Sequence, residues 1–289
     1  MMNWNQLISA KRFGMEEFHE ERQENRSEFQ RDYDRLIFSA PFRRLQNKTQ
    51  VFPLPGSVFV HNRLTHSLEV ASVGRSLGDD VAKALLERHP ELQDSFLPEI
   101  GSIVSAACLA HDLGNPPFGH SGEKAISTFF SEGKGVRLKE KQPNGEQLSP
   151  MEWEDLIHFE GNANAFRILT HQFEGRRKGG FVLTYTTLAS IVKYPFSSSL
   201  AGTKSKFGFF VSEEESFRKI ATELGLILLN EHPLKYARHP LVYLVEAADD
   251  ICYQMMDIED AYKLKILTTE ETKELLICLL YTSPSPRDQ

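Results

Sequence analysis

Apolar residues recur at the spacing of an α-helix over most of this 289-residue chain, and this pattern constrains the fold most strongly. Residues 64–85 place one apolar face on a long helix, formed by Leu64, Leu68, Val73, Leu77, Val81 and Leu85. A second face lies at 100–108, and further helices are expected within 15–40, at 213–229 and at 241–261. No repeat or linker divides these segments, so the sequence predicts one mainly α-helical domain.

The helical pattern is interrupted at a few places. Residues 49–61 hold two prolines and a glycine between short apolar runs, which favours a short β-hairpin near residues 50–60. Residues 131–150 are rich in Gly, Lys, Glu and Gln and are expected to form an exposed excursion. Ser212 and Glu215 have the spacing of a capping box, which predicts that a helix begins there.

Composition and charge exclude several classes of protein. Hydrophobic residues make up 40% and charged residues 25% of the chain, which is ordinary for a folded globular protein. No run of about 18 apolar residues is present, so we expect no membrane-spanning helix and no membrane partner. The net charge of −7 disfavours a protein that mainly coats nucleic acid, but it permits an anionic substrate beside a metal or local arginines.

The N-terminus and the cysteines favour a cytoplasmic location. The first residues lack the basic and apolar segments of a signal peptide. The three cysteines form no C-x-x-C pair, which is typical of reduced thiols in a reducing compartment.

Two histidines and two aspartates lie on apolar helix faces, where their burial is costly unless a partner compensates it. His111 and Asp112 end the apolar segment 100–108, His66 begins the 64–85 face, and Asp249 lies within the last long helix. Taken alone, a His-Asp pair is more often a core histidine held by a neighbouring acid. Together, two imidazoles and two carboxylates form a ligand set that suits Mn, Fe, Co, Zn or Mg.

Spacing supports two further assignments. His120 and Glu123 are three residues apart at an expected helix start, so their side chains can hydrogen-bond and transfer protons. Asp249, Tyr253 and Asp257 are four residues apart in turn, so one helix face can present all three to one cavity. The neighbouring acid at position 250 points about 100° away, which favours Asp249 as the fourth metal ligand.

Four segments resemble a known family. The order His66, His111-Asp112, Asp249 is similar to the H…HD…D pattern of the HD-domain metal-dependent phosphohydrolases. Residues 42–52, 111–120, 159–163 and 246–253 read FRRLQNKTQVF, HDLGNPPFGH, FEGNA and EAADDICY. These strings resemble the deoxyguanosine triphosphate triphosphohydrolase (dGTPase) family, and the resemblance extends from about Phe29 to about Ala261.

The resemblance implies an HD-domain helical bundle and metal-dependent hydrolysis of dGTP or a related dNTP to deoxynucleoside and inorganic triphosphate. The implied ligands of one divalent ion are His66, His111, Asp112 and Asp249. The implied catalytic pair is His120 with Glu123, and whether His120 activates water or protonates the leaving 5′-oxygen stays open. The implied substrate contacts are Gln50, Val51, Arg63, Asn162, Lys193, Tyr194, Tyr253 and Asp257.

The resemblance also implies a particular domain organisation and particular partners. We expect residues 1–278 to form a triphosphohydrolase core that is truncated at its C-terminal side. Residues 279–289 break the helical pattern and are expected to be a non-native tail. The expected partners of the full-length protein are a dNTP, with dGTP favoured, further copies of itself, and single-stranded nucleic acid as a regulator.

Two alternatives remain open at this level. The first is an HD phosphohydrolase that acts on another nucleotide, such as a nucleoside monophosphate or a signalling nucleotide. The second is a non-catalytic HD module that binds nucleic acid or a partner, for which Arg43, Arg44 and Lys48 form a small basic cluster.

Overall fold

The computed structural model describes residues 2–18, 26–52, 60–140, 147–175 and 178–282. Its α-helices are α1 (Trp4–Leu7), α2 (Glu28–Ile37), α3 (Ala40–Arg44), α4 (Arg63–Arg88), α5 (Ile100–Ala110), α6 (Gly119–Ser131), α7 (Pro150–Ile157), α8 (Gly161–Thr170), α9 (Tyr185–Ile191), α10 (Glu214–Glu223), α11 (Val242–Lys263) and α12 (Thr269–Thr282). The strands β1 (Leu228–Asn230) and β2 (Lys235–Tyr236) pair antiparallel. The mainly α-helical fold predicted from the periodicity is confirmed.

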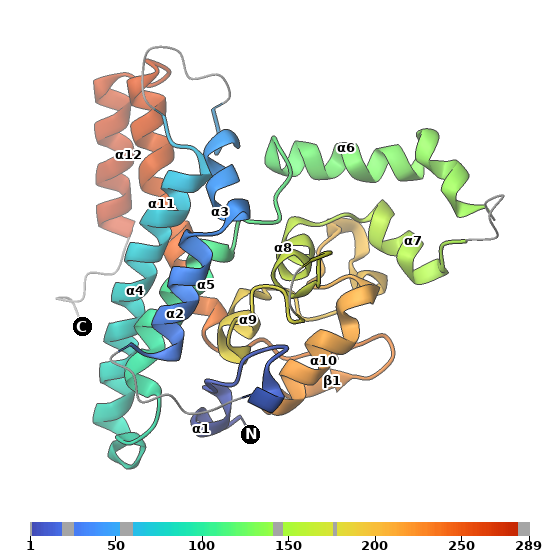
Figure 1. Cartoon of the computed structure of the whole chain (residues 1–289). Helices are drawn as coiled ribbons and strands as arrows, with labels where there is room; N and C mark the ends of the chain where they lie inside the picture. Colours follow the sequence, from blue (N-terminus) through green and yellow to red (C-terminus); the bar gives the residue numbers. More distant parts are fainter. Residues whose placement is uncertain (1, 19–25, 53–59, 141–146, 176–177, 283–289) are drawn as a thin grey trace.

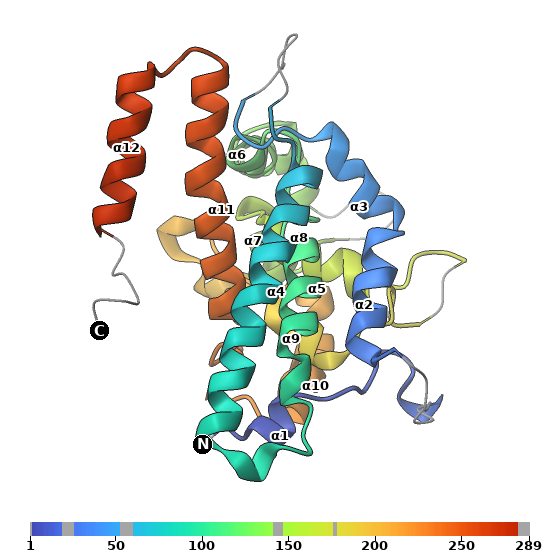
Figure 2. The same ribbon diagram turned by 90° about the vertical axis from the view of Figure 1, so that its left-hand side faces the viewer.

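The long helices form a bundle around α5. Helix α5 packs against α2, α4, α9 and α11, and α12 lies on the outer side of α11 (Figures 1 and 2). Almost every side chain of α5 is buried, as expected for a helix that is apolar on all sides. A Cβ added to Gly78 of α4 would lie 2.7 Å from the Cα of Gly101 in α5. The two backbones therefore approach closely near the start of α5.

A second group of helices, α6 to α10, lies beside this bundle (Figure 1). Helix α8 begins with Gly161, and its N-cap is the buried carboxylate of Glu160, which accepts from the backbone N–H groups of Asn162 and Ala163. Helix α9 joins the two groups because it contacts both α5 and α8. The site described below lies where these groups meet.

The helix expected at 213–229 is shorter than predicted, and the prediction of a capping box at its start is wrong. Helix α10 ends at Glu223, and the chain then forms β1. The Ser212 hydroxyl donates to Glu213 and accepts from Arg167, so it does not cap the helix. A capping box does form at the start of α7, between Ser149 and Glu152, within the segment expected to be an excursion.

The remaining local expectations lie largely outside the described residues. The β-hairpin near 50–60 falls mostly on 53–59, which are not described, and Thr49 forms an isolated antiparallel bridge with Asn62 on either side of them. Of the expected tail 279–289, the backbone is helical up to Thr282, and 283–289 lie outside the described residues. Within the described residues, none of the helices is both long enough and apolar enough to cross a membrane.

Candidate metal centre and active site

Three helices bring the predicted metal ligands together. His66 lies in the first turn of α4, His111 caps the end of α5, and Asp249 lies in the middle of α11. The Nε2 of His66 lies 3.0 Å from the Oδ1 of Asp249, and the Nε2 of His111 lies 3.6 Å from the same oxygen. One ligand atom from each of His66, His111 and Asp112 lies within 4.8 Å of the other two. These separations suit donors that bind one ion at about 2.0–2.3 Å.

A hydrogen bond to the backbone orients the imidazole of His111. Its Nδ1 lies 2.6 Å from the carbonyl oxygen of Cys108 and donates to it. This bond leaves the Nε2 lone pair facing Asp112 and Asp249, which is the arrangement that metal-binding histidines usually adopt. The other imidazole, of His66, is buried, and its Nδ1 has no hydrogen-bond partner among the described residues.

The electrostatics of the cluster favour a cation. Burial lowers the pKa of His111, but the charges of Asp112 and Asp249 outweigh burial and raise this pKa to about 9. Burial also opposes ionisation of Asp249, yet His111 and His66 hold its pKa well below the usual range. The buried carboxylate of Asp112 and the partly buried carboxylate of Asp249 thus hold positive charge between them, and a divalent ion would supply that charge by displacing the proton. The residues present therefore fit a metal ion.

Asp249 and Asp250 differ in the way that the helical period predicts. Asp249 faces the two imidazoles, whereas Asp250 is exposed to solvent. On the same helix, the Tyr253 hydroxyl donates to the carboxylate of Asp257 one turn further on. Tyr253 is half exposed, and Asp257 is partly buried. The three residues of the predicted stripe therefore follow one another along one side of α11.

Arg63 lies inside the cluster rather than at its edge. Its Nη1 lies 2.6 Å from the Oδ2 of Asp112, and its side chain is largely buried. The Oδ1 of Asp112 accepts a hydrogen bond from Asn115 Nδ2. Both oxygens of the Asp112 carboxylate are therefore held by hydrogen bonds. One of the two donors is Arg63, which the resemblance implies is a substrate contact.

The structure does not bring His120 and Glu123 into contact. His120 is exposed in the first turn of α6 and makes no hydrogen bond within the described residues. The Oε1 of Glu123 accepts from the backbone N–H of Gly161 at 2.8 Å, and its Oε2 lies 3.6 Å from the ammonium of Lys206. Catalytic hydrogen bonds are often long in unliganded enzymes. The pairing of His120 with Glu123 therefore stays a prediction.

The other predicted substrate contacts have mixed surroundings. Lys193 pairs with Glu246 at 2.9 Å and lies 5.8 Å from the ring centroid of Tyr194. Asn162 donates to Glu160 at 2.7 Å, at the start of α8.

The remaining two predicted substrate-contact residues, Gln50 and Val51, lie just before residues 53–59, which the structure does not describe. The Oε1 of Gln50 is buried without a partner among the described residues, and Val51 is 42% exposed. An unpaired buried acceptor at Gln50 is compatible with a ligand-binding role.

Several residues near the site were not predicted. Lys206 lies between two carboxylates, 2.9 Å from Glu160 and 3.6 Å from Glu123. Glu160 is unexpected because glutamate is not among the preferred N-cap residues. Lys48 was placed in the small basic cluster with two arginines, but its ammonium donates to backbone carbonyls of the turn after Asp112. Only the FEGNA string hinted at Glu160, and no local pattern singles out Lys206.

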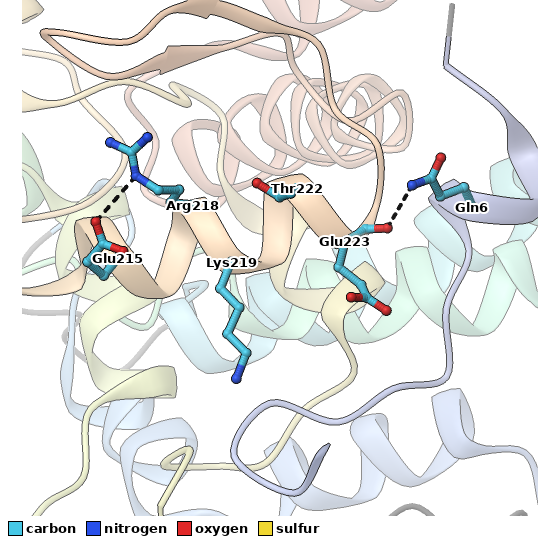
Figure 3. Close-up of a pocket in the computed structure, with 6 residues that line it drawn as sticks. All are labelled: Gln6, Glu215, Arg218, Lys219, Thr222 and Glu223. Atoms are coloured by element: carbon cyan, nitrogen blue, oxygen red, sulfur yellow. Dashed lines mark hydrogen bonds and ion pairs between the residues drawn. The ribbon is translucent and has the colours of Figure 1, made fainter. Parts of the chain in front are cut away.

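Several cavities among the described residues lie outside this cluster. One of about 660 Å³ lies between α1 and α10, where Gln6 Nε2 donates to the carbonyl oxygen of Glu223 (Figure 3). It contains none of the predicted site residues. Another, of about 940 Å³, is lined by Arg35, Arg43 and Arg44 together with Phe38 and further residues of α3 and 173–181.

The helical bundle and its His/Asp cluster define an HD-domain protein. The family described as HD domain matches residues 63–177, which include His66, His111 and Asp112 and end before Asp249. Beyond this domain, nearly the whole chain is similar to curated proteins named deoxyguanosinetriphosphate triphosphohydrolase or deoxyguanosinetriphosphate triphosphohydrolase-like protein.

Three relatives illustrate the similarity. A deoxyguanosinetriphosphate triphosphohydrolase-like protein of Pseudomonas aeruginosa is 45% identical over 302 residues, which cover 99% of this chain and 65% of the relative. A protein of the same name from Synechocystis is 45% identical over 92% of this chain and 61% of its own length. A Yersinia enterocolitica protein named deoxyguanosinetriphosphate triphosphohydrolase is 36% identical over 96% of this chain and 58% of its own length. The chain thus spans about three fifths of these relatives.

Proposed function

We propose that the protein is a metal-dependent phosphohydrolase that converts dGTP or a related dNTP to a deoxynucleoside and inorganic triphosphate. The observation that carries the proposal is the convergence of His66, His111 and Asp249 from three helices, with Asp112 beside them. Such a nitrogen and carboxylate set suits Mn, Mg, Fe, Co or Zn. The names of the relatives support a deoxynucleoside triphosphate as substrate.

The bound ion would polarise a phosphate oxygen and offset the negative charge that develops there. Arg63 and Lys193 would hold the polyphosphate, and each now pairs with a carboxylate, Asp112 and Glu246 respectively. A phosphate group can replace a carboxylate as partner of either cation, because both offer charged oxygen acceptors. Substrate binding would therefore exchange one set of charge-assisted hydrogen bonds for another.

Proton transfer at the cleaved bond would fall to His120. Its imidazole is exposed on α6 and makes no competing hydrogen bond within the described residues. A change of its rotamer could bring it to Glu123, whose carboxylate is held in place by Gly161 and Lys206. That contact would fix the tautomer of His120 and raise its basicity.

Gln50, Asn162, Tyr253 and Asp257 would contact the nucleoside. The amide oxygen of Gln50 has no partner among the described residues, and the Tyr253 hydroxyl and the Asp257 carboxylate lie on the same side of α11 as the proposed ligand Asp249. Hydroxyl and carboxylate groups can recognise the 3′-hydroxyl of a deoxyribose. These contacts, with Val51 and Tyr194, favour a deoxynucleoside triphosphate over a nucleoside monophosphate or a signalling nucleotide.

The products distinguish the proposal from its alternatives. The protein would be incubated with dGTP and Mn²⁺ and followed by ³¹P NMR, beside samples with EDTA, a nucleoside monophosphate or a cyclic dinucleotide. We expect deoxyguanosine and triphosphate only with dNTP and metal. Release of pyrophosphate or of orthophosphate would identify another phosphohydrolase, and unchanged nucleotides would favour a binding module. Because the relatives are longer, the full-length protein is the form to assay.

A second candidate function, binding of single-stranded nucleic acid as a regulator, has support from one cavity. Arg43 and Arg44 line the 940 Å³ cavity together with Arg35, and none of its lining residues is acidic. Phe38 is 71% exposed there and could stack on a base. A fluorescent oligonucleotide would lose affinity in the double variant Arg43→Gln/Arg44→Gln if this surface binds it. Equal binding by both proteins would exclude this surface.

Two further properties accompany the proposed function. Large apolar side chains remain exposed on α11, on α12 and in the connection between them, among them Tyr243, Ile251, Ile266 and Ile277, which supports self-association in the full-length protein. Light scattering after size exclusion would measure the oligomer. Cys108 and Cys252 are buried free thiols, in keeping with a cytoplasmic protein.

A further inference from the structure

The turn that carries Asp112 has three consecutive backbone carbonyls, those of Leu113, Gly114 and Asn115. These residues follow the end of α5 at Ala110, so the helix's own hydrogen bonds do not include their carbonyls. A polar backbone group that is buried without a partner costs free energy, so these carbonyls need donors from elsewhere.

Two side chains from distant elements supply those donors. The ammonium of Lys48, which follows α3, lies 2.5 Å from the carbonyl oxygen of Asn115 and 3.4 Å from that of Leu113. On the opposite side, the Nδ2 of Asn164 in α8 donates to the carbonyl oxygen of Gly114 at 2.8 Å. All three carbonyls are therefore held by groups that belong neither to α5 nor to α6.

The turn also has no room to shift towards α8. A Cβ added to Gly114 would lie 2.0 Å from the carbonyl oxygen of Gly161 and 2.2 Å from the backbone nitrogen of Ala165. The first turn of α8 thus packs directly on the turn after Asp112, and the same Gly161 donates to Glu123. Helix α8 therefore fixes both the backbone next to Asp112 and the carboxylate of Glu123, the proposed partner of His120.

We propose that Lys48 and Asn164 are positioning residues for the metal site: they hold the turn 113–115 from two sides and thereby fix the Asp112 carboxylate relative to His66 and His111. This inference rests on the proposed function, since it requires that Asp112 binds a metal. Neither residue contacts the ligand atoms, so their effect passes through the backbone. Partners that orient metal ligands in this way typically contribute about 10–100-fold to metal affinity.

Binding of Mn²⁺ to the metal-free chain tests the inference without reference to turnover. Isothermal titration would compare the wild type with Lys48→Met, which keeps the length of the side chain, and Asn164→Asp, which keeps its shape but removes the donor. Lys48→Arg should recover most of the affinity because it restores a donor. Lys83→Met, an exposed lysine on α4, is the matched control. Titrations are made at a temperature where circular dichroism finds every variant folded.

We expect Lys48→Met and Asn164→Asp each to weaken Mn²⁺ binding by about 10-fold, the lower end of the range for such partners. Wild-type affinity in both folded variants overturns the inference, even if their melting temperatures fall, because that result describes a structural role only. If Lys48→Met does not fold, Asn164→Asp alone decides. A wild-type chain that binds no Mn²⁺ would instead remove the proposed metal site, and this inference with it.

Discussion

The Nε2 of His66 lies 3.0 Å from the Oδ1 of Asp249, although 183 residues separate the two positions in the chain. Each residue sits on a different helix, and α4 and α11 must pack side by side to create the contact. Of the adjacent acids Asp249 and Asp250 on α11, only Asp249 lies next to the imidazoles. The site therefore depends on the packing of the bundle as much as on its ligands.

Replacing Asp249 by Ala should remove most of the metal affinity, whereas Asp250→Ala should leave it unchanged. The loss should exceed the roughly 10–100-fold that an outer partner contributes, because a ligand is removed. Metal content after dialysis, measured by mass spectrometry on both variants, checks this. Equal loss in the two variants, or loss only in Asp250→Ala, would contradict the assignment.

His120→Ala should lower turnover by about 10²–10⁴-fold and leave the metal bound, because a proton-transfer residue is lost and a ligand is not. Triphosphate release by the full-length protein measures the turnover rate, and mass spectrometry measures the amount of bound metal. Ser121→Ala, the exposed neighbour on α6, is the control. Near-normal turnover, or loss of the metal, would show that His120 has another role.

Periodicity and composition were sufficient to predict the helical fold, because α4, α5 and α11 bury continuous apolar faces. They were not sufficient for contacts between distant segments. Nothing in the sequence near Lys48 predicts that its ammonium donates a hydrogen bond to a backbone carbonyl of the turn after Asp112. The capping box predicted from local sequence at Ser212 does not form either. The Ser212 hydroxyl, which would have capped α10, instead accepts a hydrogen bond from Arg167 of α8.

Within the site, residue types predicted the cluster of imidazoles and carboxylates but not its internal pairing. Arg63 binds Asp112, and Glu123 binds Gly161 and Lys206, because buried charges pair with the groups that folding brings closest. Neither pairing has a local signature, since the partners lie tens of residues apart.

Gly78→Ala should destabilise the fold by roughly 1–3 kcal/mol through overpacking, although alanine is the better helix former. The new methyl group would meet the backbone of Gly101 in α5, at 2.7 Å from its Cα. Urea denaturation measures the change in the free energy of unfolding. Ser76→Ala, at an exposed position of the same helix, should cost nothing comparable. Unchanged stability of Gly78→Ala would mean that α4 and α5 pack less closely than described.

His239 should make the protein less stable as the pH falls below about 6.5. It is fully buried, donates from Nε2 to the carbonyl oxygen of Leu7 and accepts at Nδ1 from the Leu241 N–H. Burial lowers the pKa of His239 to about 4, so the unfolded chain binds the proton more tightly. Stability from this group is fully present above pH 6.5, declines as the pH falls towards 4, and is lower by about 2 kcal/mol at pH 5.

Urea denaturation at pH 7 and pH 5 tests this dependence in the wild type and in His239→Gln, which cannot titrate. The variant should be less stable at pH 7, since its hydrogen bonds are altered, but it should lose less stability between the two pH values. An identical loss in both proteins would assign the pH dependence to other groups.

The central claim, that four side chains bind one divalent cation, is tested most directly by anomalous diffraction from crystals soaked in Mn²⁺. We predict one peak per chain at about 2.0–2.3 Å from the Nε2 atoms of His66 and His111 and from carboxylate oxygens of Asp112 and Asp249. A peak elsewhere, or a site that lacks any of these four ligands, would contradict the claim.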